Sequence, residues 1–232
     1  MHRDETSKGL RRRDALAGLA TLAVGTPALA PALASAKPLT TTPAVSGERP
    51  SDVHPLLVGQ KIPDVMALDL DGKAVSLRAL AAERHTIFVF FRGGWCPYCT
   101  RQMSQLKSIE APLKQAGWQI VGITAEPLER FQTQASKLDL PYRLLADDQF
   151  KVSTAFGLTY KVKPQDIGGP PGIEYWRQLY KVGPEVDPVL PVPAVFAVHP
   201  KGLVLHQYVN VDYTVRLSGE VLLTVAKVYG PA

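Results

Sequence analysis

Cysteine is scarce in this sequence, and its scarcity excludes several classes of protein. The 232 residues contain only two cysteines, Cys96 and Cys99. A small disulfide scaffold needs several such pairs, and a structural zinc site takes four ligands. A bridge between residues this close in sequence would close a short loop and add little stability. The spacing instead suits reversible thiol–disulfide chemistry, in which one sulfur attacks and its neighbour resolves.

Strong charge and long apolar segments are missing from most of the chain. The formal net charge is +5, and no basic cluster lies outside the first 36 residues, so nothing favours a nucleic-acid partner. Beyond that N-terminal segment, no apolar run approaches the roughly 20 residues of a spanning helix. We therefore expect no stable membrane insertion once that segment is removed.

The N-terminal segment itself has the features of an export signal. Residues 11–13 are three arginines, residues 16–30 are apolar, and residues 34–36 form an Ala-Ser-Ala cleavage pattern. The arginine run resembles a twin-arginine signal, an address read by a receptor. A membrane anchor is disfavoured because the apolar run is short and contains prolines. We predict residues 1–36 as a signal peptide, export to the periplasm, and a flexible Pro/Thr/Ser-rich tether over residues 37–54.

The remaining residues, 55–232, are predicted to form one domain in which strands alternate with helices. The patterns predict strands at 86–91, 118–124 and 142–146, hairpins at 65–77 and 194–210, and helices from the cysteines to Gly117, from Pro127 to about 138, near 149–156 and at 218–229. In the last helix, Val221, Leu222, Val225 and Val228 are expected to face the core. This order predicts an α/β fold with a central mixed sheet flanked by helices.

A long Pro- and Gly-rich segment, residues 157–192, interrupts the alternation and contains one helical pattern at 173–182. A connection of this length is often functional. It either covers the core or borders the functional site as a lid, and the sequence leaves both open.

The cysteines lie where an apolar strand is expected to enter a helix. Unpaired N–H groups and the helix dipole favour a thiolate on Cys96 at that position, and Pro97 suits the first helical turn. Arg92 either adds positive charge near a sulfur or is a solvated residue at the strand end. Trp95 either shields the thiols or simply packs. We expect Cys96 to be the more exposed of the two sulfurs.

Three stretches carry a resemblance to a known family: residues 58–80, "FFRGGWCPYCTRQM" (90–103) and residues 190–217. The arrangement of a strand, a WCxxC motif and a helix is similar to the active sites of the thioredoxin superfamily. The wider pattern resembles the alkyl hydroperoxide reductase/thiol-specific antioxidant family, the peroxiredoxins and their relatives. The resemblance implies a thioredoxin-like fold, with the segment 157–192 inserted before a strand that begins at a cis-proline, Pro193.

The resemblance also implies roles for individual residues. Cys99 takes the place of the family's peroxidatic cysteine, Cys96 that of a threonine and Arg92 that of a proline. Arg216 matches the distant arginine that polarises peroxide. In the thioredoxin register, however, Cys96 attacks and Cys99 resolves, so which sulfur leads stays open. The predicted site is Cys96, Cys99, Arg92 and Arg216, shaped by Trp95, Pro97 and Pro193, with a redox disulfide between the cysteines.

Two activities fit these residues. The first is a thiol-dependent peroxidase, regenerated by a thiol reductant; the second is a thiol–disulfide oxidoreductase acting on exported proteins. No cofactor is implied. A metal or binding module is a third alternative, disfavoured because the candidate histidines are not spaced as ligands: His54, His85, His199 and His206.

Overall fold

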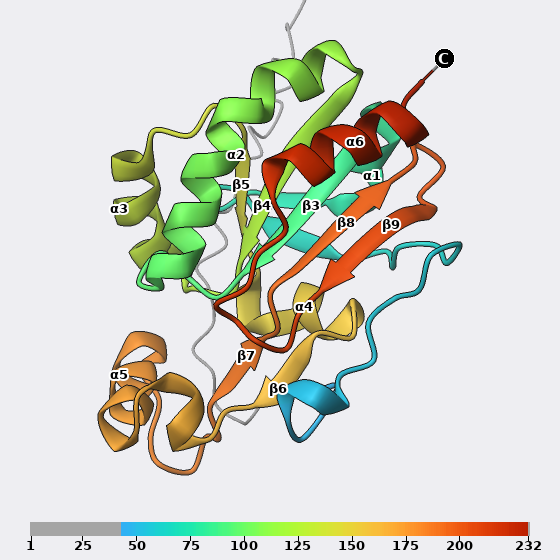
Figure 1. The fold of residues 1–232 in the computed structure, drawn as a ribbon. Coiled ribbons are helices and arrows are strands. Elements are labelled where there is room, and N and C mark those ends of the chain that lie inside the picture. The colour runs from blue at the N-terminus through green and yellow to red at the C-terminus, as the bar shows by residue number, and fades with distance from the viewer. Residues whose placement is uncertain (1–42, 232) are drawn as a thin grey trace, which may run out of the picture. The chain divides into compact units, whose positions relative to one another are not determined.

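The computed structural model describes residues 43–231, and the predicted signal peptide lies outside them. Its main feature is a seven-stranded sheet with the order β2-β1-β5-β4-β3-β8-β9 (Figure 1). The strands are β1 Met66–Leu68, β2 Ala74–Ser76, β3 His85–Phe91, β4 Trp118–Thr124, β5 Arg143–Ala146, β8 Ala194–Val198 and β9 Val204–Val209. β6 Thr159–Lys161 and β7 Val189–Pro191 pair separately as a small antiparallel sheet.

Six α-helices accompany these strands within the described residues. They are α1 Leu77–Glu83, α2 Pro97–Gln115, α3 Leu128–Leu138, α4 Lys151–Ala155, α5 Pro170–Tyr180 and α6 Gly219–Tyr229. Short 3₁₀ turns occur at Pro50–Asp52, Asp148–Phe150 and Pro164–Ile167.

The sheet is mixed, as predicted. β3 runs parallel to β4 and antiparallel to β8, and β4 runs parallel to β5. Every residue of β3 is buried. A strand covered on both faces reads as an unbroken apolar run, and this is the sequence signal that "TIFVFF" carries.

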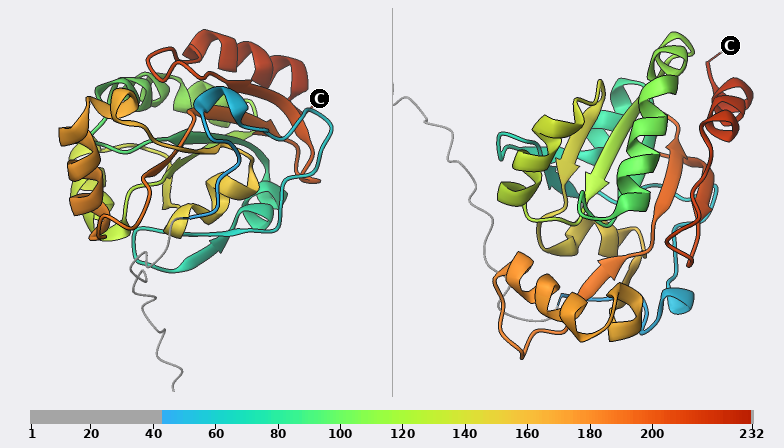
Figure 2. Two further views of the ribbon diagram at one scale, coloured as in Figure 1. Left: turned by 90° about the horizontal axis from the view of Figure 1, so that it is seen from below. Right: turned by 60° about the vertical axis from the view of Figure 1, so that its left-hand side comes forward.

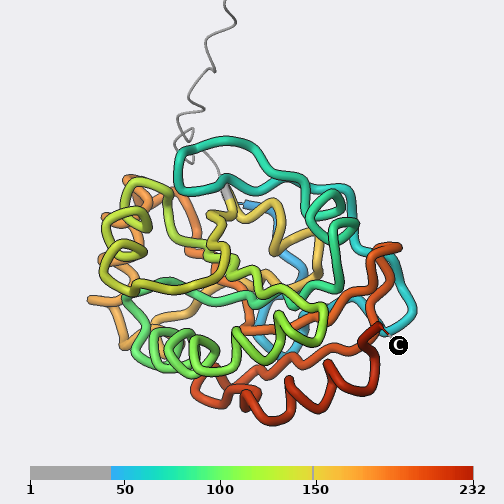
Figure 3. The backbone as a smooth tube through the Cα atoms, turned by 90° about the horizontal axis from the view of Figure 1, so that it is seen from above, coloured from blue at the N-terminus to red at the C-terminus, as the bar shows by residue number. Residues whose placement is uncertain are grey.

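Helices cover both faces of this sheet. One core contains alternate residues of β3, such as Ile87 and Val89, together with residues of α2, α3 and α6. The other contains Phe88 and Phe90 with residues of α1 and α4. Viewed from above, α2 and α6 lie side by side on one face of the sheet, and α1 lies on the other (Figure 3). The α/β fold with a flanked mixed sheet is therefore confirmed.

Outside the insertion the predicted elements match the observed ones except for helix α1, which was not predicted, and the inward face of the last helix was partly wrong. In α6 the buried residues are Leu222, Val225 and Ala226, whereas Val221 is 43% and Val228 68% exposed. Positions i, i+3 and i+4 share one side of a helix, and Val221 is rotated away from that side. α6 packs on α2 and on Trp118, whose indole N–H donates to the Ala226 carbonyl at 3.1 Å.

Part of the predicted tether is packed against the domain. The backbone N–H groups of Ser46 and Gly47 donate to the Thr159 carbonyl at 2.8 and 3.0 Å, and Gly47 forms a bridge with Tyr160 of β6. A Cβ at Gly47 would lie 2.6 Å from the Asp52 backbone, so the glycine permits this close approach. The prediction of a flexible tether is wrong for residues 43–54, and residues 37–42 lie outside the described residues.

The insertion, residues 157–192, forms β6, α5 and β7. It lies beyond the end of β3, close to the first turn of α2 (Figures 1 and 2). Its own core includes Trp176 and Tyr180, packed with Ala125 and Phe150 of the main domain. Trp176 donates to the Val189 carbonyl at 3.0 Å, and Tyr180 to the Ala125 carbonyl at 2.6 Å. The Tyr180 hydrogen bond attaches the insertion to the main domain, whereas the Trp176 hydrogen bond joins α5 to β7 within the insertion.

The predicted cis bond before Pro193 is not found. Among the described residues no peptide bond is cis, so Val192–Pro193 is trans. The Val192 N–H donates to the Leu158 carbonyl at 2.9 Å, and the Pro193 carbonyl accepts from Asn210 at 3.4 Å. The chain thus passes directly from β7 into β8 with its backbone groups paired on both sides, in the trans form that X–Pro bonds favour.

None of the helices in the described part of the chain is long and apolar enough to cross a membrane.

Candidate active site

Cys96 lies at the junction between the loop after β3 and helix α2. It is the N-cap residue of α2, and its carbonyl accepts from the N–H groups of Cys99 and Thr100 at 3.0 and 3.1 Å. Pro97 occupies the first helical position, where a missing N–H leaves no hydrogen bond unmade. The free N–H groups and the dipole at this helix end favour negative charge, as the sequence predicts.

The pKa values of the two thiols are shifted in opposite directions. A hydrogen bond from the Cys99 thiol is the main cause that lowers the pKa of Cys96 to about 6, and the positive charges of Arg92 and Arg216 lower it further. Burial raises the pKa of Cys99 well above its usual value, and the neighbouring Cys96 raises it further. At neutral pH Cys96 is therefore the thiolate and Cys99 the thiol that donates to it.

Both sulfurs are enclosed. Cys96 is 1% and Cys99 0% exposed, so the expected difference in exposure is absent. Both thiols are free in the structure. The predicted disulfide between them stays a prediction.

Arg216 contacts the pair, as the resemblance implied. Its Nη2 donates to the Cys99 sulfur at 3.3 Å, although the two residues are 117 positions apart. Arg216 belongs to the loop between β9 and α6, which passes the first turn of α2 (Figure 1).

Arg92 is buried beside the pair rather than solvated. It is 1% exposed, and its guanidinium lies 4.2 Å from the ring centroid of Tyr213 and 5.2 Å from that of Trp95. Its Nη2 also donates to the Asp166 carbonyl in the insertion at 3.2 Å. Cation–π contacts on two rings help to hold this charge close to Cys96.

Aromatic side chains extend the cover over the thiols on both sides. Trp95 contacts Tyr175 of α5 at 6.2 Å between ring centroids, and Tyr98 contacts Tyr213 at 5.8 Å. The insertion therefore borders the site while it also covers part of the core, so the structure combines the two readings of residues 157–192, and its role as a lid stays a prediction. The Nε atoms of Arg92 and Arg216 and the Nε1 of Trp95 are buried donors without an acceptor among the described residues.

Glu126 supports the loop that carries the cysteines. Its carboxylate accepts from the Gly94 N–H at 2.9 Å, and its side chain is fully buried. Burial raises the pKa of this carboxyl group, while the Gly94 bond and the charge of Arg130 oppose the rise. The sequence analysis missed Glu126, Tyr213 and Tyr175. Only Tyr213 has a local signal, because it lies three residues before Arg216.

The structure thus brings five of the predicted residues into contact around one sulfur pair: Cys96, Cys99, Arg92, Trp95 and Arg216. Pro97 starts the helix below them. Pro193 lies buried before β8, in a trans peptide, and its shaping role stays a prediction.

The pH dependence of the thiolate checks this assignment. We expect the ultraviolet absorbance of one thiolate to appear with a midpoint near pH 6. Because the pKa is lowered in the folded state, the thiolate is present above this midpoint and is lost as the pH falls through it. Cys99→Ala removes the donor, and its midpoint should move towards the ordinary cysteine value. An unchanged midpoint in this variant would contradict the role of Cys99 as donor.

The other candidate sites lack a comparable group of reactive side chains. In the described part of the chain, no three His, Cys, Asp or Glu side chains are placed to hold a metal ion. His85 and His199 approach each other, with 5.0 Å between ring centroids, at the opposite end of β3 from the cysteines.

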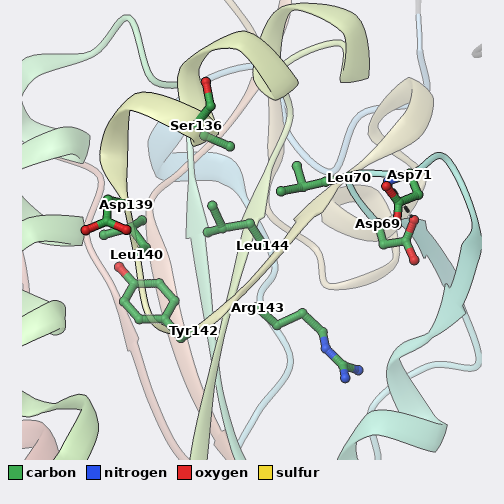
Figure 4. Close-up of a pocket in the computed structure, with 10 residues that line it drawn as sticks. Asp69, Leu70, Asp71, Ser136, Asp139, Leu140, Tyr142, Arg143 and Leu144 are labelled. Atoms are coloured by element: carbon green, nitrogen blue, oxygen red, sulfur yellow. Dashed lines mark hydrogen bonds between the residues drawn. The ribbon is translucent and has the colours of Figure 1, made fainter.

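A groove of about 440 Å³ lies between the β1–β2 turn, the end of α3 and β5. Asp69 and Asp71 lie at one end of it, and Asp139 and Tyr142 at the other (Figure 4). Asp69 accepts from the backbone of Asp71 and Lys73, and Asp139 pairs with Lys107 at 3.0 Å. These carboxylates therefore serve the local structure.

Comparison with known proteins places this site in a family. The profile of the AhpC/TSA family matches residues 58–207, well over half of the chain. The chain belongs to the AhpC/TSA family. The matched stretch includes both cysteines and Arg92, whereas Arg216 lies beyond its end. The resemblance stated from the sequence is confirmed.

Individual AhpC/TSA relatives are similar over shorter stretches. A chloroplastic peroxiredoxin Q of Gentiana triflora is 31% identical over 113 residues, 48% of each chain. The thiol-disulfide oxidoreductase ResA of Halalkalibacterium halodurans is 30% identical over 91 residues, 39% of this chain and 51% of ResA. The chain thus spans about half the length of the curated relatives it matches.

A solved structure supports the fold. The peroxidoxin BcpB of Mycobacterium tuberculosis superposes with a TM-score of 0.57, covering 74% of this chain and 97% of BcpB. The two chains share 16% sequence identity. This likeness confirms the thioredoxin-like architecture of the AhpC/TSA domain.

Proposed function

We propose that this protein reduces peroxides through the Cys96–Cys99 pair. The observation that carries the proposal is the position of Cys96 at the N-terminus of α2, enclosed beside Cys99 and close to the guanidinium groups of Arg92 and Arg216, which together lower its pKa. The thiolate is the nucleophilic form of cysteine, and the enclosure strengthens electrostatic contacts. Similarity to peroxiredoxin Q supports the same chemistry.

The first step is the attack of the Cys96 thiolate on the peroxide O–O bond. The sulfur takes one oxygen and becomes a sulfenic acid, the O–O bond breaks, and the other oxygen leaves as an alcohol or as water after protonation. Negative charge moves from sulfur to the leaving oxygen. The buried donors of Arg92, Trp95 and Arg216 that lack acceptors suit the stabilisation of that charge.

The second step closes the disulfide. Cys99 attacks the sulfenic sulfur of Cys96, an S–S bond forms, and water leaves with the proton of the Cys99 thiol. A thiol reductant then supplies two electrons and two protons to restore the dithiol. The family resemblance implies that Cys99 is the cysteine that attacks peroxide. The raised pKa of Cys99 and its role as hydrogen-bond donor to Cys96 instead favour a resolving role for Cys99.

Thiol–disulfide exchange is the second candidate. Similarity to ResA and the low pKa of a cysteine at a helix N-terminus favour it. The enclosure of Cys96, which is 1% exposed, opposes it, because a protein disulfide must reach the attacking sulfur.

A comparison of the two activities tests the proposal. The full chain, reduced with dithiothreitol, is mixed with hydrogen peroxide or with the disulfide of insulin, and the loss of each is followed in time. We expect catalytic peroxide loss and slow insulin reduction. Rapid insulin reduction without catalytic peroxide loss would overturn the proposal in favour of exchange.

A further inference from the structure

Arg92 is a cation buried beside the cysteine pair, and its side chain is 1% exposed. An arginine guanidinium keeps its charge at every pH at which proteins fold, so Arg92 cannot lower the cost of its burial by releasing a proton. A buried charge is stable only when other groups compensate for the water that it has lost. The partners of Arg92 therefore decide how much free energy its burial costs.

The hydrogen-bond and ring partners of Arg92 within the described residues are all neutral. Its Nη2 donates to the Asp166 carbonyl at 3.2 Å, whereas the carboxylate of Asp166 accepts from the Lys163 N–H at 2.8 Å. Its Nε has no acceptor in this part of the chain. The ring centroids of Trp95 and Tyr213 lie 5.2 and 4.2 Å from its guanidinium. These cation–π contacts compensate for the burial of the charge only in part.

The Cys96 thiolate is the anion that the structure places near this cation. Cys96 follows Arg92 by four positions and is itself 1% exposed. After the hydrogen bond from Cys99, which is the main cause, the charge of Arg92 also lowers the pKa of Cys96. Two opposite charges enclosed together attract each other more strongly than they would in water. In the dithiol state the thiolate and the guanidinium therefore compensate each other.

Oxidation removes this anion and leaves the cation. A disulfide is neutral, whereas Arg92 stays charged, so the disulfide state contains a buried guanidinium without its counterion. The cross-link adds little stability in return, because a bridge between Cys96 and Cys99 closes only a short loop. The equilibrium between the two states therefore shifts towards the dithiol.

We infer that Arg92 is a buried counterion that makes the Cys96–Cys99 disulfide easy to reduce, so that a monothiol of the glutathione class is sufficient to restore the dithiol. Two glutathione thiols supply two electrons and two protons; the S–S bond of the pair breaks and that of glutathione disulfide forms. This inference rests on the proposed thiol–disulfide cycle, but not on peroxide as the oxidant.

Equilibration with glutathione tests the inference. The full chain is incubated at neutral pH with mixtures of reduced and oxidised glutathione, and the dithiol fraction is measured by alkylation and mass spectrometry. We expect Arg92→Leu to shift the equilibrium constant towards the disulfide by at least about 10-fold, the usual effect of a nearby opposite charge on an ionised group. Arg101→Leu removes the same charge from an exposed position of α2 and should change the constant by less than about 2-fold. An unchanged constant in Arg92→Leu would overturn the inference.

The stability of the unaltered chain gives a second measurement, which does not depend on the folding of a variant. Protein reduced with dithiothreitol and protein oxidised with diamide, which takes up the two thiol hydrogens, are each unfolded in urea. We expect the dithiol form to have the higher urea midpoint, whereas a cross-link alone would favour the disulfide form. A higher midpoint for the disulfide form would contradict the inference. Neither measurement uses peroxide, so the expected shifts in a protein that fails to consume peroxide would reject the peroxidase proposal alone.

Discussion

Replacement of Cys96 by serine is expected to lower the rate constant of peroxide reduction by at least about 1000-fold, the scale of loss when a covalent nucleophile is removed. A serine hydroxyl is not ionised at neutral pH, whereas the Cys96 thiolate has a pKa of about 6. The measurement is stopped-flow consumption of hydrogen peroxide by the reduced full chain.

Cys99→Ser is the matched control, since it changes the same atom in the neighbouring thiol. A serine at this position keeps a hydroxyl donor for the Cys96 sulfur, so one rapid turnover should remain and dimedone should trap a sulfenic acid on Cys96. The disulfide cannot form, so repeated turnover should stop. If Cys96→Ser instead forms a sulfenic acid on Cys99, and Cys99→Ser is inert, the two roles are reversed.

Trp176→Ala is expected to lower the free energy of unfolding by about 3–5 kcal/mol, the usual cost of truncating a buried aromatic side chain. Trp176 is 2% exposed, lies 4.4 Å from Tyr180 between ring centroids and donates to the Val189 carbonyl. Its loss leaves a cavity at the point where the insertion joins the main domain. Urea unfolding followed by circular dichroism measures the effect.

Gln178→Ala provides the comparison on the same helix. Gln178 is exposed, and its hydrogen bond is made to Glu174 on the surface, so its replacement should change stability by no more than about 0.5 kcal/mol. A Trp176→Ala protein as stable as Gln178→Ala would contradict the view that the insertion is an integral part of the domain.

Much of the fold could be predicted because the relevant signals are local. The apolar run of β3 is a signal of hydrophobic pattern, and the Asp71-Gly72 turn between β1 and β2 is a signal of turn-forming residues. Neither signal depends on distant parts of the chain. The Cys-Pro-Tyr-Cys stretch likewise carries its own information. A cysteine at a helix N-terminus becomes acidic through the backbone that follows it, so a reactive pair could be inferred without knowledge of its neighbours.

The remaining features depend on which residues meet across long distances in sequence. Tyr213 lies on Arg92, and Tyr175 on Trp95, only because the insertion and the β9–α6 loop converge at the first turn of α2. The difference in acidity between two adjacent thiols follows from burial and from which sulfur donates, and neither has a sequence pattern. Packing also decided that Val221 faces solvent, because the helix pattern allows several rotations about its axis. Local chemistry therefore specified a redox pair, whereas the enclosure of that pair and the choice of its thiolate required the folded chain.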